Sequence, residues 1–253
     1  MRAKLADAAA ALGNLTVFAG RVAGALPSAA VHPSWWLPYL HRQLVGTLPI
    51  LTAAGLAMGV VAWLQLRQLL AQFQSVELLP SALALSVVWE FGPVAAGLIA
   101  AARLGAGLGA ELGAMRISEQ LDAAEVVGVG VTRRMIAPRV LAAMLALPLL
   151  CVLVDWLAIL SGFLAEAVGG TMSWEAYAHE ALRYLKLKDA LPATLKTVVF
   201  GFLIGVTGCG AGLAAEGGTE GVGLAANRAV VHAMLAVLAA DVVCVRVIQL
   251  LTP

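Results

Sequence analysis

The amino-acid sequence predicts an all-α integral membrane protein with five membrane-spanning helices. Of its 253 residues, 61% are hydrophobic and only 12% are charged, whereas soluble domains average about 25% charged residues. The apolar residues gather in five stretches that reach the roughly 20 residues needed to cross a bilayer. A charged hairpin separates the second stretch from the third. We therefore expect one domain over residues 1–253, with an N-terminal interfacial helix and a short cytoplasmic helix in the hairpin.

Residues 1–26 carry an apolar stripe at near-heptad spacing. Its members are Leu5, Ala8, Leu12, Leu15, Ala19, Val22 and Leu26. Asp7, Asn14 and Arg21 repeat on another face, so the segment is predicted to be an amphipathic helix at the membrane surface. A cleaved signal peptide is the alternative, but Asp7 and Asn14 would interrupt its apolar core.

Residues 33–42 complete the predicted interfacial region, 1–42. They place Trp35, Trp36 and Tyr39 beside His41 and Arg42. Aromatic side chains next to basic ones are typical of the headgroup layer.

The five predicted spans form a bundle over residues 43–253. They are residues 43–66, 80–109, 140–165, 195–215 and 229–251. Pro49 falls in the first turns of the first span, where proline is tolerated. Short polar connections are expected over 67–77 and around the glycine-rich segment 216–223, and a longer mixed segment over 166–192.

The basic residues predict the orientation of the chain. Nine of the 16 fall in segments on the N-terminal side of the membrane and four on the other side, while Arg103, Lys196 and Arg246 lie in or at the ends of spans. Because basic residues favour cytoplasmic loops, we expect the N-terminus and the 110–139 hairpin in the cytoplasm and the C-terminus on the opposite side.

Several classes of site find no support in the sequence. No Gly-x-x-x-x-Gly-Lys-Ser/Thr motif occurs, so this chain is not expected to be an enzyme, and any ATP would be bound by another chain. The histidines lack metal-ligand spacing, and the three cysteines fall in apolar runs. We expect no metal, no cofactor and no disulfide. A net charge of +1 gives no indication of nucleic-acid binding.

Glycines recur four residues apart within the spans. The pairs are Gly55/Gly59, Gly105/Gly109, Gly109/Gly113, Gly201/Gly205 and Gly208/Gly212. Such pairs let helices approach closely. They serve either packing within one subunit or, for some of them, the seam of a homodimer.

Three acids interrupt the predicted spans. Glu90, Asp155 and Asp241 would each cost a few kcal/mol or more if exposed to lipid, so each should face a cavity, a partner or the bundle. For Glu90, lining of a substrate cavity and bonding to a neighbouring helix both stay open. Asp155 and Asp241 are interpreted as structural hydrogen-bonding groups.

The charged hairpin is predicted to contain a short helix. Ser118 is the expected N-cap and the helix should end near Gly128. Glu119, Asp122 and Glu125 recur at a spacing of three, which places them along one side. Acids facing anionic lipid headgroups would be unfavourable, so docking onto another protein is favoured over a position at the membrane surface.

The same region carries a series of short motifs. They are Glu90-Phe91-Gly92-Pro93, Glu111-Leu112-Gly113-x-Met115-Arg116, Glu119-Gln120-Leu121-Asp122-Ala123-x-Glu125, Gly128-Val129 and Pro138-Arg139, with Arg228-x-x-Val231-His232, Leu235 to Leu238 and Asp241 further on. Together they resemble the MlaE/YrbE family, permease subunits of ABC transporters that move lipids together with MCE-domain proteins. The resemblance covers roughly residues 35–251.

The resemblance implies a homodimeric permease in a bacterial inner membrane or a plastid inner envelope. Residues 117–129 would be the coupling helix that docks in a groove of a cytoplasmic ATPase, and an MCE-domain protein would cap a cavity for lipid, in particular phospholipid. The contact with the ATPase would use Glu119, Gln120, Leu121, Asp122 and Glu125, and the cavity Glu90, Phe91 and Pro93.

The sequence departs from the family pattern at three places. Trp89 stands where a basic residue is usual, Phe91 where leucine is usual, and 130–132 lack the usual proline. Two other functions stay open: a stand-alone carrier or channel using Glu90, Asp155 and Asp241, and a membrane scaffold that only recruits a partner. The absence of an internal repeat disfavours the carrier.

Overall fold

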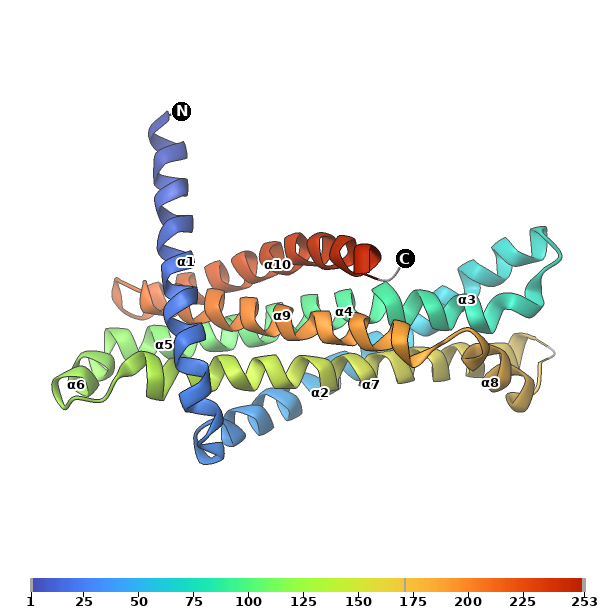
Figure 1. The fold of residues 1–253 in the computed structure, drawn as a ribbon, viewed down its shortest axis with the longest axis horizontal. Helices are drawn as coiled ribbons and strands as arrows, with labels where there is room; N and C mark the ends of the chain where they lie inside the picture. The colour runs from blue at the N-terminus through green and yellow to red at the C-terminus, as the bar shows by residue number, and fades with distance from the viewer. Residues whose placement is uncertain (1, 171, 252–253) are drawn as a thin grey trace.

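The computed structural model describes residues 2–170 and 172–251, without the side chains of residues 2–12, 187–189 and 251. It confirms the all-α class, because the described residues form helices and no strand. Five helical segments are long and apolar enough to cross a membrane: Pro33–Gln72, Val76–Ile117, Thr132–Gly169, Ala190–Leu213 and Gly218–Leu250. They lie side by side as an elongated bundle, with the hairpin helix α6 at one end and α8 at the other (Figure 1).

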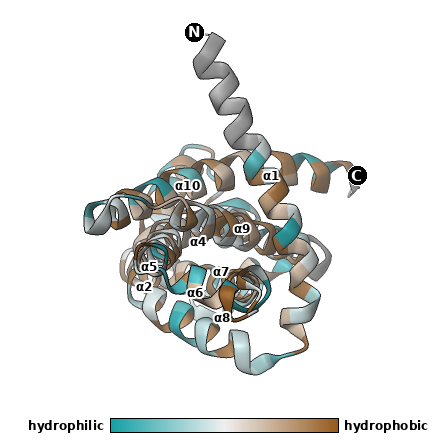
Figure 2. Ribbon diagram, turned by 90° about the vertical axis from the view of Figure 1, so that its left-hand side faces the viewer, coloured by the Kyte–Doolittle hydropathy of each residue, from teal (hydrophilic) through white to brown (hydrophobic). Residues whose placement is uncertain are grey.

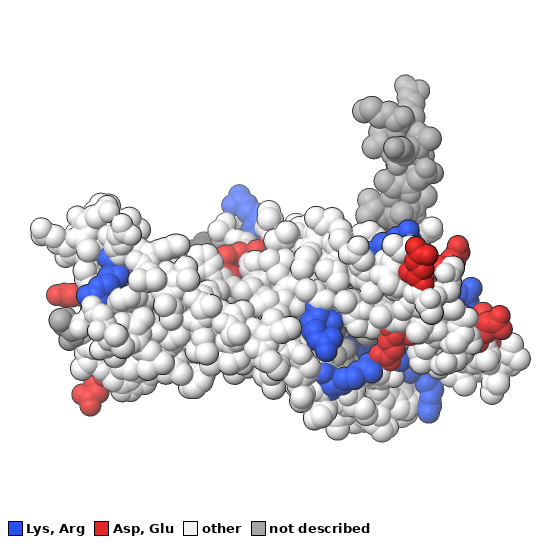
Figure 3. Space-filling view, turned by 180° about the vertical axis from the view of Figure 1, so that it is seen from behind, with Lys and Arg blue, Asp and Glu red and all other residues white. Residues whose placement is uncertain are grey.

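The surface of this bundle is apolar over its middle. Large side chains such as Leu64, Trp156 and Val242 are more than half exposed. In the space-filling view uncharged atoms cover most of the molecule, and many Lys, Arg, Asp and Glu side chains lie toward the two ends, with a few nearer the middle (Figure 3). A surface of this kind matches the hydrocarbon layer of a bilayer, so the bundle is an integral membrane protein.

Helix α1 (Arg2–Ala30) runs across the long axis of the bundle (Figure 1), and its C-terminal part lies along the side of the bundle when it is viewed from one end (Figure 2). The described members of its predicted apolar stripe face the bundle, whereas Val17 on another face is exposed. Val22 is fully buried in a core cluster with Leu112 and Ile136, and Leu15 and Leu26 pack against that cluster. The C-terminal half of the predicted stripe is therefore a contact with the bundle, while the side chains of Leu5, Ala8 and Leu12 lie outside the described residues.

Helix α2 (Pro33–Gln72) is one continuous helix of 40 residues. The predicted headgroup segment 33–42 is its first turns, with Pro33 at the N-terminus, where a missing N–H costs nothing. The polar connection expected over 67–77 is shorter than predicted, because the chain turns only around Gln74, which has a φ of 51°. The segment Arg67–Gln72 contains polar residues, but its residue types favour a helix. A 40-residue helix is longer than a bilayer is thick, so its polar end can stay helical outside the membrane.

The second span is built from consecutive short helical pieces. They are η1 (Val76–Leu78), α3 (Leu79–Ser86), the π-helical turn η2 (Val87–Phe91), α4 (Gly92–Ala100), the π-helical turn η3 (Ala101–Gly105) and α5 (Ala106–Ile117). At η2, Gly92 N–H donates to Val87 O, five residues back. Pro93 explains the widening, because it has no N–H for the carbonyl of Trp89 and its ring would clash there.

The hairpin helix α6 (Gln120–Val126) is shorter than the predicted 117–129, and its start differs from the prediction. Ser118 does not cap it. The Ser118 hydroxyl instead donates to Ala114 O at 2.8 Å, one turn back in α5, and Glu119 occupies the N-cap position with a left-handed φ of 58°. The predicted end is confirmed, since Val127 is the C-cap and Gly128 follows with a φ of 81°, which glycine adopts without strain.

The third span joins the π-helical turn η4 (Thr132–Ile136) to α7 (Ala137–Gly169). Pro138 follows η4 as Pro93 follows η2, and Ala137 N–H donates to Thr132 O, again five residues back. After α7 the chain forms α8 (Trp174–Arg183), then α9 (Leu187–Leu213) and finally α10 (Gly218–Leu251).

The end of the bundle that carries α8 is held by a buried acid. Glu166 Oε2 accepts from Trp63 Nε1 at 2.8 Å and pairs with Arg67 Nη1 at 2.7 Å, which ties α2 to α7. Tyr177 of α8 lies in the same core cluster as Trp63 and is fully buried. Burial, and then the charge of Glu166, raises the pKa of the Tyr177 hydroxyl above its usual range.

The predicted glycine pairs all pack within this chain. A Cβ on Gly59 would lie 2.0 Å from Ala158 O, and one on Gly201 would lie 2.5 Å from Ala143 O. On α5 and α9, Gly109 lies against Ala229 and Gly212 against Leu112. These glycines bring α2 and α9 onto α7, and α5 onto α9 and α10, so a homodimer seam would use other residues.

Candidate functional site

A cluster of three ionisable groups lies inside the bundle. Lys196 of α9 reaches Glu90 Oε2 of η2 and Asp241 Oδ1 of α10, both at 2.8 Å. The Lys196 side chain is only 2% exposed and that of Asp241 11%, whereas that of Glu90 is 42% exposed. One lysine is therefore shared by two acids, and Glu90 is the member of the triad nearest the surface.

The π-helical turn positions Glu90 at this surface. An extra residue in the turn rotates the following side chains relative to a regular α-helix. Trp89 and Phe91, on either side of Glu90, are 46% and 50% exposed, while Pro93 is buried. Of the predicted cavity residues, Glu90 and Phe91 thus face outward and Pro93 shapes the helix beneath them. The result is an acid set in an apolar, partly aromatic surface.

Asp155 supports the same turn from α7. A Cβ on Gly92 would lie 1.7 Å from Asp155 Oδ1, so the carboxyl group sits directly on the bare backbone of Gly92. Its other oxygen lies 3.7 Å from Cys151 Sγ. The glycine of the motif Glu90-Phe91-Gly92-Pro93 is therefore required by close packing of the buried aspartate.

A second charged network lies toward the α6 end of the bundle. Glu111 of α5 pairs with Arg42 of α2 and, at 2.6 Å, with Arg139 of α7. Arg139 is almost fully buried, and its guanidinium group lies 4.4 Å from the ring centre of Tyr39. Paired in this way, a buried arginine avoids the several kcal/mol that an isolated buried ion costs. One glutamate thus connects three spans.

Helix α6 presents polar side chains on an apolar anchor. Glu119, Gln120, Asp122 and Glu125 are exposed, and Asp122 pairs with Arg116 of α5. Leu121 is only 3% exposed and packs in the core cluster with Leu112 and Val22. Of the residues predicted to contact another protein, four are accessible and Leu121 instead anchors the helix.

The tip of the hairpin is unusually exposed. Val126 and Val127, which directly follow the acidic residue Glu125, are 88% and 80% exposed. Glu119 holds a left-handed backbone conformation that costs a non-glycine residue about 1–2 kcal/mol. Exposed apolar side chains next to a strained turn are features of a docking surface.

Sequence reasoning missed two of the residues that hold these networks together. Lys196 was assigned only to the end of a span, and Glu111 was given no role. A signal existed for Lys196, because a lone lysine among apolar residues needs an acidic partner. No comparable signal identified Glu111, since Arg42 and Arg139 are far from it in the sequence. Among the described residues, no group of three or more His, Cys, Asp or Glu could hold a metal ion.

Comparison with known proteins adds to this geometry. The family model described as Permease MlaE matches residues 37–247. A probable ABC transporter permease protein of Rickettsia typhi is 31% identical over 215 residues, 83% of either chain. The intermembrane phospholipid transport system permease protein MlaE of Haemophilus influenzae is 32% identical over 81% of this chain and 80% of its own. The chloroplastic protein TRIGALACTOSYLDIACYLGLYCEROL 1 of Arabidopsis thaliana is 31% identical over 91% of this chain and 66% of its own.

Proposed function

Because this chain belongs to the MlaE permease family, we propose that it is the membrane-spanning subunit of an ABC transporter that moves phospholipid. A separate ATPase would supply the energy, and no covalent chemistry would occur in this chain. The observation that carries the proposal is α6, a short acidic helix held at one end of an integral membrane bundle by Leu121.

Coupling to the ATPase would run through α6. Its exposed face carries Glu119, Asp122 and Glu125, while Leu121 packs beside Val22, Leu112 and Ile136. A push on the exposed face would therefore be transmitted to α1, α5 and η4 through packed side chains, since close-packed interiors transmit strain. In this mechanism, nucleotide binding in the partner biases two arrangements of the spans.

The lipid would contact the surface around Glu90. Trp89 and Phe91 offer apolar area for acyl chains, and the triad of Glu90, Lys196 and Asp241 offers charges of both signs. A zwitterionic headgroup carries both signs as well. The support for phospholipid is this mixture of surfaces, together with the similarity to the Haemophilus influenzae relative, whose name describes phospholipid transport.

The remaining assignments rest on the family resemblance. We propose that two copies of the chain form the lipid cavity and that an MCE-domain protein receives or delivers the lipid. The proposed membrane is a bacterial inner membrane or a plastid inner envelope, with the N-terminus and α6 in the cytoplasm and the C-terminus outside. The excess of basic residues on the N-terminal side supports this orientation.

The test is stimulation of the partner ATPase in proteoliposomes. The double variant Glu119→Lys/Asp122→Lys reverses the charge of the exposed α6 face and should abolish most of the stimulation, because a buried charge contact that becomes repulsive costs several kcal/mol. The matched control is Glu77→Lys/Glu175→Lys, which reverses two exposed acids at the other end of the bundle. Unchanged stimulation by the first variant would refute the coupling role. Lipid transfer without any ATPase would instead favour a stand-alone carrier.

A further inference from the structure

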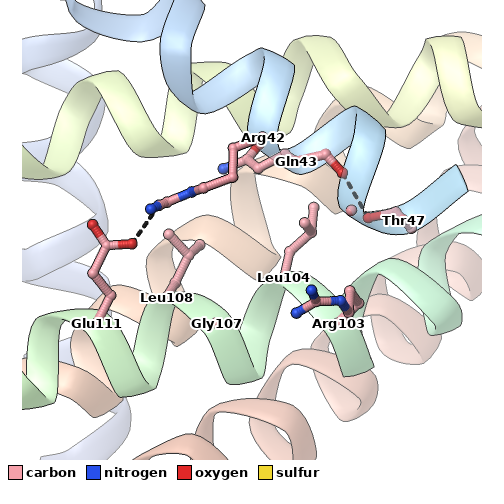
Figure 4. Close-up of a pocket in the computed structure, with 9 residues that line it drawn as sticks. Arg42, Gln43, Thr47, Arg103, Leu104, Gly107, Leu108 and Glu111 are labelled. Carbon is pink, nitrogen blue, oxygen red and sulfur yellow. Dashed lines mark hydrogen bonds and ion pairs between the residues drawn. The ribbon is translucent and has the colours of Figure 1, made fainter.

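A pocket of about 240 Å³ opens on the side of the bundle between α2 and the η3–α5 helix. Its lining includes Arg42, Gln43 and Gly46 on α2, and Arg103, Gly107 and Glu111 on the facing helix. In Figure 4, Arg42 reaches across the pocket to Glu111, and the guanidinium group of Arg103 points along α5 toward Gly107. The pocket is separate from the triad around Lys196, none of whose members line it.

The charges around this pocket are unbalanced. Arg42 and Arg139 share a single acid, Glu111. Arg103 is exposed and makes no hydrogen bond or ion pair with any described residue. Its guanidinium group lies against the backbone of Gly46, where a Cβ would be 3.5 Å from Nη2. Three arginines with one carboxylate leave an excess of positive charge, with free donors on Arg103 aimed into the pocket.

The position of Arg103 in the membrane makes a missing partner costly. At a rise of about 1.5 Å per residue, it lies about 20 Å along the helix from Ile117. Tyr39 belongs to the aromatic segment that is typical of the headgroup level. Gly46 lies two helical turns further along α2, deeper in the membrane than Tyr39, and it faces Arg103. An arginine at that depth directs its charge toward the interface and toward any phosphate there.

The pocket also offers hydrogen-bond acceptors and a suitable size. Gln43 is 5% exposed, and its Oε1 has no partner among the described residues. Gln43 Oε1 and Glu111 can accept from the ammonium or hydroxyl groups of a lipid headgroup. Pockets that enclose whole drug-sized ligands measure roughly 300–1,000 Å³, so this smaller one would take a headgroup and leave the acyl chains in the bilayer.

We propose that this pocket binds the phosphate of a membrane phospholipid from the leaflet at the α6 end, with Arg103 and Arg42 as donors. Guanidinium groups bind phosphate through paired N–H donors, which makes arginine well suited to this role. A bound phosphate would compete with Glu111 for Arg42. It would thereby alter the ion pairs through which Glu111 connects α2, α5 and α7. The proposal requires only that the bundle lies in a membrane, and it does not rest on the transport function.

Native mass spectrometry of the full-length chain in detergent tests this site. The probes are phosphatidylglycerol, diacylglycerol, which lacks the phosphate, and inorganic phosphate. Arg103→Gln should weaken phosphatidylglycerol binding about tenfold, since hydrogen bonds to charged groups contribute about 1.5–3 kcal/mol each. Gly107→Phe should weaken it as much by filling the pocket, because a Cβ on Gly107 meets nothing within 4 Å and the fold tolerates it.

Two matched controls separate the pocket from general effects. Arg228→Gln removes another exposed arginine that makes no hydrogen bond or ion pair with any described residue, and Gly223→Phe adds a ring to an equally open glycine on α10. Both should bind phosphatidylglycerol like the unmodified chain. Equal binding by Arg103→Gln and Gly107→Phe would overturn the proposal. So would equal binding of diacylglycerol, or displacement of the lipid by millimolar inorganic phosphate, which would make the pocket a free-phosphate site.

Discussion

The residue on which the membrane interior depends most is Lys196. It is the shared partner of Glu90 and Asp241 and is almost completely buried. Buried ion pairs contribute little net stability when intact, but removing one member leaves an uncompensated charge. Removing Lys196 would leave both Glu90 and Asp241 without a cationic partner among the described residues.

We therefore expect Lys196→Met to destabilise the protein by about 3–5 kcal/mol, measured as a lowered midpoint of thermal unfolding in detergent. Glu90→Gln should cost much less, because the Glu90 side chain is 42% exposed and Lys196 keeps Asp241. Adding Asp241→Asn and Glu90→Gln to Lys196→Met should recover part of the loss by removing the stranded charges. A triple variant as unstable as Lys196→Met alone would show that packing, rather than charge, is the cause.

At the scale of elements, the regular helical geometry is interrupted next to two prolines. Pro93 and Pro138 each follow a π-helical turn, and the first of these turns presents Glu90. Helix α6, with seven residues, is too short to be stable alone in water, so its structure depends on the packing of Leu121 against α1, α5 and η4.

Leu121→Ala should accordingly loosen α6. The substitution removes about 2–5 kcal/mol of local packing, so amide hydrogen exchange over residues 119–128 should become much faster while the spans stay protected. Val126→Ala is the control, because Val126 is 88% exposed and its truncation should change stability by less than about 0.5 kcal/mol. Unchanged exchange in Leu121→Ala would mean that α6 is held by something other than this contact.

At the scale of the whole molecule, the fold separates two ends that differ in their charged groups and helices. The end with α6 carries the Glu111 network, the arginine pocket and α1, and the other end carries α8 (Figure 1). In Figure 3 most of the surface between the two ends is uncharged, with a few charged groups on it. Because the single span Thr132–Gly169 lies between α6 and α8, these ends are expected on opposite sides of the membrane.

Labelling with a membrane-impermeant maleimide checks this arrangement. In a Cys244→Ser background, Glu175→Cys on α8 should react in intact cells, whereas Glu125→Cys on α6 should react only after the membrane is opened. Both positions are exposed, and the other native cysteines are buried. The reverse pattern would invert the predicted orientation, and reaction of both positions in intact cells would contradict the crossing of the membrane by the segment Thr132–Gly169 that lies between them.

The sequence by itself determined the properties that follow from local composition. Hydropathy and length predicted five spans, which the structure confirms, and the position of Gly128 predicted the end of α6. The motifs between Glu90 and Arg139 predicted the family, which the comparisons confirm. Each of these signals depends on residues close together in the chain, so no knowledge of packing was required.

Only the tertiary structure decided which distant groups meet. Lys196 lies 106 residues from Glu90, and Arg42 lies 69 residues from Glu111. It also showed that Leu121 faces inward, that Ser118 bonds back into α5, and that the C-terminal half of the α1 stripe packs against the bundle. The physical reason is common to all of them. Hydrophobic and ionic contacts depend on which faces the packing of helices brings together, and a local sequence pattern does not specify the neighbour.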